Sequence, residues 1–207
     1  MISWVALERI VQRQAASDAK YRKKIAGRPL RSDAKRLTDA ELLTKLGSFG
    51  IDLDRSRLEH LCDTALSAEE VARPLLEQCT FSSRLEGDWI WICLTTLWER
   101  WFPDKPCFEA LDDKIQAGYE VMASGGAVAA CRIWLDAWAD VLRILDKAGF
   151  ESINDFDNEF RGTQSLFNWI QDLEGRTVER GASGQSIPGV ENRRMRGRSE
   201  KVRSERR

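Results

Sequence analysis

DWIWICLTTLWERWF, residues 88–102, is the stretch of the sequence that decides the fold. At helical spacing its apolar side chains cover nearly every face, and Trp91, Leu94, Trp98 and Trp101 lie on one stripe. A helix that is apolar all round is a buried helix. No apolar run in the chain reaches the length of a membrane span. We therefore predict that this segment is the most buried helix of a protein core, and that it is contacted by residues 106–147.

Short helices with clear starting signals precede this segment. Thr38 and Glu41 have the spacing of a capping box, and Ser67 and Glu70 repeat it. Asp54 is a third candidate N-cap. These signals predict three short helices between residues 38 and 77. Further upstream, residues 2–25 read as one helix that ends before the glycine and proline of residues 27–29.

Two longer helices are expected after residue 102, at about 106–123 and 127–147. Small and aromatic residues occur along them at the spacing of a tetratricopeptide hairpin, namely Gly118, Gly125, Ala130, Trp134 and Ala137. An ordinary helical hairpin is the alternative. Shorter helical pieces follow at about 152–160 and 164–173. Since no stretch alternates like a strand, the predicted fold class is all-α, with a Trp-rich core and a tetratricopeptide-like hairpin.

The charge of the chain changes sign twice along its length. Residues 1–37 carry a net charge of +7, residues 38–175 a net charge of −14, and residues 176–207 a net charge of +6. We divide the chain accordingly into a basic N-terminal helix and linker (1–36), an acidic helical domain (37–174) and a basic tail (175–207). The tail has few large apolar side chains, so we expect it to be disordered.

The sequence offers no evident catalytic or metal-binding constellation. His60 is the single histidine, and neither a CxxC nor an HxxxH spacing occurs. Asp155, Asp157 and Glu159 resemble the start of a calcium loop, but Phe160 stands where such a loop needs glycine. We predict a non-enzymatic protein without cofactor or metal, and a solvated helix face at Asp112 and Asp113. Five cysteines, most of them in apolar helical patterns, favour the reducing cytoplasm.

A basic cluster near the N-terminus is a candidate nucleic-acid arm. It consists of Lys20, Arg22, Lys23, Lys24 and Arg28. The Gly-Arg-Pro sequence at residues 27–29 is similar to arms that insert arginine into the minor groove of DNA. Ala26 stands where such arms carry a second arginine, and the acidic body would repel phosphate.

Several stretches carry a resemblance to a family. They are Leu37-Thr-Asp-Ala-Glu-Leu-Leu43, Gly50-Ile-Asp-Leu53, Asp88-Trp-Ile-Trp91, Leu97-Trp-Glu-Arg-Trp101 and Thr163-Gln-Ser-Leu-Phe-Asn-Trp-Ile-Gln-Asp172. Together they resemble uncharacterised bacterial helical proteins with tetratricopeptide-like repeats, many of which end in a zinc-binding SEC-C motif. The resemblance implies a helical fold and a general binding role. The cysteine cluster of the SEC-C motif is absent here, so its zinc is not carried over.

The resemblance ends near residue 174. Members of the family continue with an Asn-Ala-Gly-Leu turn, whereas this chain has Glu179-Arg-Gly-Ala182. One possible set of codons for Glu179-Arg-Gly-Ala182 reads as Asn-Ala-Gly-Leu when the reading frame is shifted by one base. This relation favours a frameshifted, truncated product. In such a product the last apolar helix lacks a polar cap, so we expect Leu166, Phe167, Trp169 and Ile170 to form an exposed interaction surface.

These observations lead to two hypotheses about function. The first is a helical scaffold that binds another protein. The second is a nucleic-acid-associated regulator that uses the basic ends. Retention on nucleic acid that falls with salt would favour the second, and a protein partner retained at high salt would favour the first.

Overall fold

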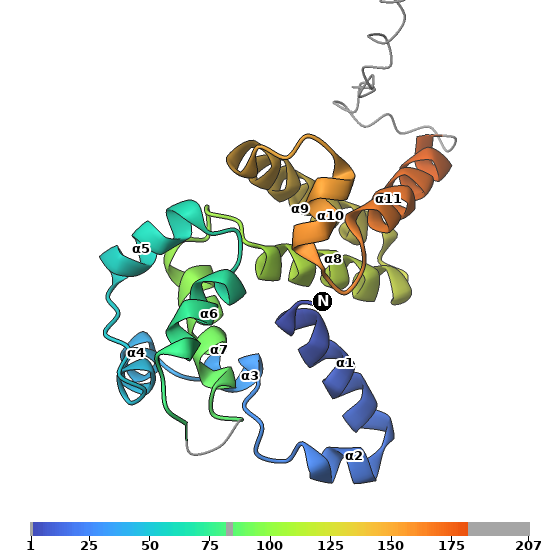
Figure 1. The fold of residues 1–207 in the computed structure, drawn as a ribbon. Coiled ribbons are helices and arrows are strands. Elements are labelled where there is room, and N and C mark those ends of the chain that lie inside the picture. The colour runs from blue at the N-terminus through green and yellow to red at the C-terminus, as the bar shows by residue number, and fades with distance from the viewer. Residues whose placement is uncertain (1, 82–84, 182–207) are drawn as a thin grey trace, which may run out of the picture.

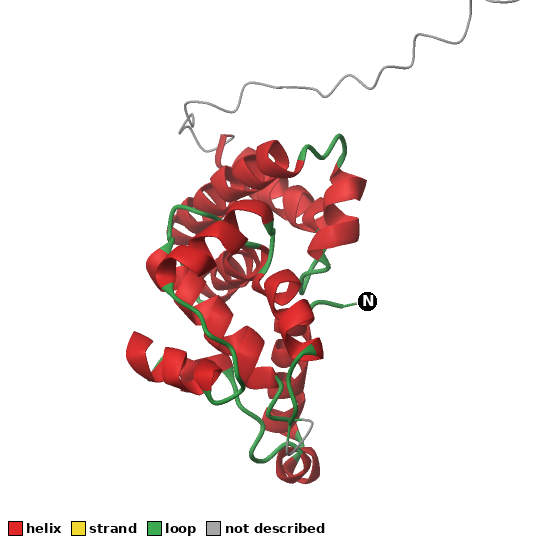
Figure 2. Cartoon of the chain, turned by 60° about the vertical axis from the view of Figure 1, so that its left-hand side comes forward, coloured by secondary structure: helices red, strands yellow, loops and turns green. Residues whose placement is uncertain are grey.

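The computed structural model describes residues 2–81 and 85–181, with side chains described up to residue 175. Helices and connecting loops make up these residues, and no strand occurs among them (Figure 2), which confirms the all-α prediction. The helices are α1 (Trp4–Ser17), α2 (Ala19–Lys24), α3 (Arg31–Ala34), α4 (Asp39–Gly47), α5 (Arg55–Thr64), α6 (Ala68–Glu77), α7 (Asp88–Trp101), α8 (Phe108–Ala123), α9 (Ala127–Ala148), α10 (Ile153–Phe160) and α11 (Leu166–Gly181). None of them is long and apolar enough to cross a membrane.

The three short helices begin at the caps that the sequence predicts. The Thr38 hydroxyl accepts a hydrogen bond from the backbone amide of Glu41, whose carboxylate accepts one from the Thr38 amide in return. Asp54 and Ser67 cap α5 and α6 by accepting from the backbone amides of Arg57 and Glu70. The capping box predicted at Ser67 is only half formed, because the Glu70 carboxylate accepts from the Leu66 amide and not from Ser67. Each cap satisfies backbone donors that the first turn of a helix leaves unpaired.

The N-terminal segment differs from the single helix expected over residues 2–25. Helix α1 ends at Ser17, and Asp18 adopts an extended conformation between α1 and α2. Its carboxylate accepts hydrogen bonds from the first amides of α2, while Arg22 donates to the carbonyls of Ala15 and Ala16 at the end of α1. Both helix ends are satisfied by side chains, and the chain turns without a glycine or proline.

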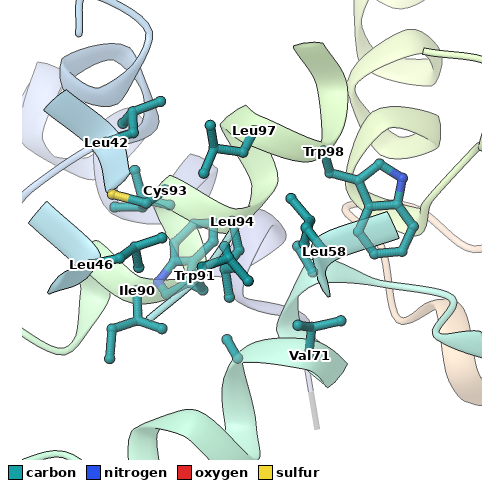
Figure 3. Packing of buried hydrophobic residues seen from close by; sticks show 14 of the residues in the cluster. Leu42, Leu46, Leu58, Val71, Ile90, Trp91, Cys93, Leu94, Leu97 and Trp98 are labelled. Atoms are coloured by element: carbon teal, nitrogen blue, oxygen red, sulfur yellow. The ribbon is translucent and has the colours of Figure 1, made fainter. Parts of the chain in front are cut away.

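Helix α7 is the centre of a first hydrophobic core. All its residues from Ile90 to Trp98 are buried, as predicted, and α3, α4, α5 and α6 pack around it (Figure 3). Trp101 is only half-buried and donates its indole N–H to Asp39. The predicted contact with residues 106–147 is present but is not the main cover of α7. Cys107 and Ala110 pack in this core, and the Lys147 ammonium lies 5.9 Å from the centroid of the Trp98 ring. The short helices before α7 cover it, and the hairpin instead belongs to a second core.

The second core is formed by helices α8 to α11. It is built from Phe108, Leu111 and Ile115 of α8, from Trp134, Ala137, Val141 and Ile144 of α9, and from Phe156, Phe160, Leu166, Trp169 and Leu173 of α10 and α11. In Figure 1 these helices lie together at one end of the molecule, and α4 to α7 lie at the other. The two cores follow one another in the sequence, with the boundary near residue 107.

Helix α1 and helix α3 join the two cores through ion pairs. Arg9 of α1 lies 3.0 Å from Asp112, and Arg31 of α3 lies 2.7 Å from Asp113. Arg31 also contacts Glu8 of α1 and Glu99 of α7. Asp112 is fully buried, so the prediction of a solvated helix face at Asp112 is wrong. Its carboxylate is enclosed because α1 lies over this part of α8, which local sequence does not show.

Helix α11 extends beyond its predicted end. It runs to Gly181 rather than stopping near Leu173, and so it crosses the expected domain boundary at residue 174. The remainder of the predicted disordered tail, residues 182–207, lies outside the described residues. Ala182, the last residue of the stretch compared with the family's Asn-Ala-Gly-Leu turn, is among them.

Candidate functional site

The α8–α9 hairpin is held at its centre by a close approach of Gly118 to Trp134. A β-carbon at Gly118 would lie 2.0 Å from Nε1 of the Trp134 indole, so glycine is required for this contact. The indole N–H donates to the Ile115 carbonyl at 3.1 Å. The Tyr119 ring packs edge-on against Trp134 with 5.0 Å between centroids. The two helices therefore approach closely at the positions that suggested a tetratricopeptide-like hairpin.

Helix α11 packs against both helices of this hairpin. The Thr163 amide, just before α11, donates to Asp112 at 2.7 Å, and the Tyr119 hydroxyl donates to Asp172 further along. The Trp138 and Trp169 rings lie 6.3 Å apart. Since contacts advance in the same direction along α8 and α11, α11 runs parallel to α8 and antiparallel to α9 (Figure 1). Burial and the neighbouring Asp172 carboxylate raise the pKa of Tyr119 above its usual value.

The start of α11 is fixed by Asp157 of α10. Its carboxylate accepts hydrogen bonds from the backbone amides of Leu166 and Phe167, at 2.5 and 3.2 Å. Negative charge at a helix N-terminus is stabilising. Asp157, which lies in the stretch that resembles a calcium loop, therefore caps a helix. Among the described residues no three His, Cys, Asp or Glu side chains are grouped so as to hold a metal ion.

The predicted interaction surface on α11 is largely inside the protein. Leu166 and Trp169 are buried in the second core, so the prediction that they are exposed is wrong. Ile170 is half-buried against the same core. Phe167 alone is exposed, with 52% of its surface accessible. The error has a physical cause, because α11 fits between α8 and α9 and buries the apolar side that the sequence suggested would be free.

A second exposed apolar surface lies on α9 and was not predicted. Val128 and Leu142 are 53% and 50% exposed, and the half-buried Leu135 lies midway between them. Residues seven apart lie on one face of a helix. We call these three residues the outer face of α9. The seven-residue spacing of these apolar side chains could have predicted this face. It was overlooked because the buried side of α9 carries a stronger apolar pattern, at Ala130, Trp134, Ala137 and Val141.

The residues of the predicted nucleic-acid arm fall into two groups, those that bind other parts of the fold and those that are exposed to solvent. The Arg28 guanidinium pairs with Asp88 at the start of α7, with 2.7 Å between Nε and Oδ2. Arg22 binds the end of α1. Lys20, Lys23 and Lys24 are exposed on α2 and form no ion pair within the described part of the chain. Two of the five side chains are therefore engaged within the fold.

A pocket of about 540 Å³ lies where the two cores meet. It is bordered by the start of α1, the α5–α6 connection and the ends of α8, α9 and α10. Glu109 lies in its wall and is buried, and its carboxylate accepts hydrogen bonds from the amides of Ala68 and Glu69 at 3.0 Å each. Burial raises the pKa of Glu109 and lowers that of Lys147, which also lines the pocket. Sequence reasoning missed this site because its residues come from five separate segments.

No family model matches the chain, and no match was found among the curated proteins or the solved structures. The resemblance to bacterial proteins with tetratricopeptide-like repeats therefore stays a prediction.

Proposed function

We propose that this chain is a non-enzymatic helical scaffold that binds another protein through the outer face of α9. The observation that carries the proposal is the way α11 stacks on the α8–α9 hairpin. The first helix of a following hairpin would stack in this way in a helical repeat array, which supports the proposal. The tetratricopeptide-like character of the hairpin is part of this proposal.

Stacked hairpins bury their faces only where a neighbour covers them. The inner side of α9 is covered by α8, and Trp138 on its flank is covered by α11. The outer face of α9 has no such cover, since Val128 and Leu142 remain half exposed. Single exposed apolar side chains are common on protein surfaces. Here two exposed side chains, Val128 and Leu142, and the half-buried Leu135 between them recur at seven-residue spacing and form a strip that suits an amphipathic helix of a partner.

The experiment compares two variants that add the same charge to the same helix. Leu142→Lys places a lysine on the outer face, and Ala129→Lys places one at an exposed position off that face. We expect both to fold, because exposed substitutions change stability by about 0.5 kcal/mol or less. Affinity capture from the source cells at high salt should recover a partner with the wild type and with Ala129→Lys, and lose it with Leu142→Lys. Equal recovery by the two variants would contradict the proposal.

The nucleic-acid hypothesis is tested alongside with Lys20→Gln, Lys23→Gln and Lys24→Gln combined. Retention of the wild type on immobilised DNA or RNA at about 150 mM salt, lost in this triple variant, would favour the regulator over the scaffold. We expect no such retention, because the acidic body opposes phosphate, Arg28 is paired with Asp88, and Arg22 is bonded to carbonyls at the end of α1.

A further inference from the structure

The pocket between the two cores is lined by apolar and charged side chains from five separate segments of the chain. Phe108, Phe150 and Phe160 supply aromatic surface, and Lys147 and Arg161 supply positive charge. Its volume of about 540 Å³ falls in the range of small-molecule sites. The Phe108 amide donates to the Leu66 carbonyl across the boundary between the cores, at 2.9 Å, so the wall is held in place by backbone contacts.

The carboxylates around the pocket are already engaged by the protein. Glu109 accepts from two amides at the start of α6, and Glu70 accepts from the Leu66 amide at 2.8 Å. Glu69 accepts from the Trp4 amide and pairs with Arg73. Of the carboxylates in the wall, Glu159 alone remains without a partner in the described chain.

Two of the three cations in the wall, Lys147 and Arg161, form no ion pair within the described chain, whereas the third, Arg73, pairs with Glu69. The Lys147 ammonium donates to the carbonyls of Cys62 and Ala65, at 2.6 Å each, and lies 5.9 Å from the centroid of the Trp98 ring, so its third N–H has no hydrogen-bond acceptor in the described chain. Arg161 donates through Nε to the Asn158 carbonyl at 2.6 Å. Its two terminal nitrogens have no partner among the residues that the structure describes. Donors that are unpaired and lie in a pocket wall favour an anion as ligand.

Arg161 is also held in an unfavourable backbone conformation. It ends α10 with φ 46° and ψ 34°, and no other described non-glycine residue has a positive φ. The left-handed region is less favourable for an ordinary residue than for glycine, because the β-carbon approaches the backbone. Glycine stands at the next position instead, where a β-carbon would lie 2.5 Å from the Phe160 ring and 2.8 Å from Asp112. Because strained residues concentrate at functional sites, an arginine kept in this conformation points to a role for its side chain.

We propose that this pocket binds a small organic acid, with the carboxylate held by Arg161 and Lys147 and the apolar part held against the phenylalanines. The site is independent of the outer face of α9, because the two share no residue.

The test uses 3-phenylpropionate and its neutral amide as probes of the full chain. Isothermal titration and two-dimensional NMR should show saturable binding of the acid, with shifts at Phe150 and Phe160, and binding of the amide at least tenfold weaker. Equal affinity of acid and amide, or no binding of the acid below about 10 mM, overturns the proposal. Shifts confined to other parts of the protein also overturn it.

Arg161→Gly separates a loss of binding from a loss of folding. This variant relieves the strained backbone, so its thermal midpoint without ligand should equal or exceed that of the wild type. Its affinity for 3-phenylpropionate should nevertheless fall at least tenfold, since charge-assisted hydrogen bonds are removed. Arg132→Gln, at an exposed position on α9, should bind like the wild type. Unchanged affinity in Arg161→Gly would show that the arginine holds no anion and would refute the site.

Discussion

Gly118 is the residue on which the α8–α9 hairpin depends most directly. Any larger side chain there meets the indole of Trp134, whose N–H already bonds to α8. Well-packed cores lose about 1–3 kcal/mol when an added methyl group forces neighbours apart.

We predict that Gly118→Ala lowers the free energy of unfolding by about 2–3 kcal/mol. Urea unfolding followed by circular dichroism measures the change. Gly47→Ala is the matched control, because Gly47 is also helical and a β-carbon there meets nothing within 4 Å. That variant should be unchanged or more stable by about 0.5 kcal/mol. Equal effects of the two substitutions would mean that the approach of α8 to α9 is looser than described.

Glu109 gives the stability of the protein a defined pH dependence. Burial raises the pKa of its carboxyl group, although the amides of Ala68 and Glu69 favour the charged form. The folded chain then binds the proton more tightly than the unfolded chain. This contribution to stability is fully present below the unfolded pKa and is lost as the pH rises through the folded pKa.

We therefore expect the free energy of unfolding to fall with rising pH above about 4.5 more steeply in the wild type than in Glu109→Gln. Chemical denaturation at closely spaced pH values measures both profiles. Glu77→Gln, at an exposed position on α6, serves as a control that should keep the wild-type profile. Parallel profiles for wild type and Glu109→Gln would exclude this carboxyl group as the source.

Helix α7 contributes more buried side chains to the first core than any other helix. Trp98 is 1% exposed, and its indole N–H donates to the Lys105 carbonyl at 2.8 Å. Lys147 of α9 also lies over this ring, with 5.9 Å between its ammonium and the ring centroid.

Trp98→Ala should cost about 3–5 kcal/mol, the usual loss for a buried tryptophan. Trp101→Ala should cost less, because that ring is only half-buried. Thermal unfolding of both variants decides the order. If Trp101 proved the more costly of the two, α7 would face the opposite way to the one described.

For individual helices, the sequence predicts those features that depend on residues close together in the chain. The caps at Thr38, Asp54 and Ser67 were predictable because donor and acceptor lie within three residues. The burial of α7 was predictable from its composition alone. The division into two cores was not, because helical periodicity shows which face is apolar but not which helix covers it.

The same limit explains the errors at the candidate sites. Asp112 looked exposed because its partner Arg9 lies 103 positions earlier in the chain. Glu109 carried no signal because the amides that it binds lie 40 and 41 positions away. Leu166 and Trp169 were correctly recognised as apolar, but their burial depends on where α11 lies relative to α8 and α9. The polar or apolar character of each residue could therefore be read from the sequence, but the residues that it contacts could not.

For the molecule as a whole, Arg31 is the link between the two cores. It contacts Glu8, Glu99 and Asp113, which come from three different helices, and it is largely buried. Burial raises the pKa of Glu99 in this group of charges. Removal of the central cation leaves carboxylates facing one another in a region from which water is mostly excluded.

We predict that Arg31→Met lowers the free energy of unfolding by about 3 kcal/mol. Arg36→Met, which breaks an exposed pair with Asp33, should change it by about 0.5 kcal/mol or less. Hydrogen exchange should also show faster exchange in α1 of the first variant. Exchange in α1 at the wild-type rate would show that its apolar contacts alone hold it in place.

The position of α1 across the second core has a consequence for the order in which the chain folds during its synthesis. Arg9 binds Asp112, and the Ser3 amide donates to the Arg161 carbonyl at 3.1 Å. Neither contact can form until its partner residue has been translated, long after α1. At about 5–20 residues per second the delay for Arg9 is on the order of ten seconds. The buried residues of the first core all emerge before α8 and can pack together during this interval. We therefore expect Trp4 of α1 to pack on the first core early, against Trp91, while the side of α1 that faces α8 stays uncovered until α8 has been translated.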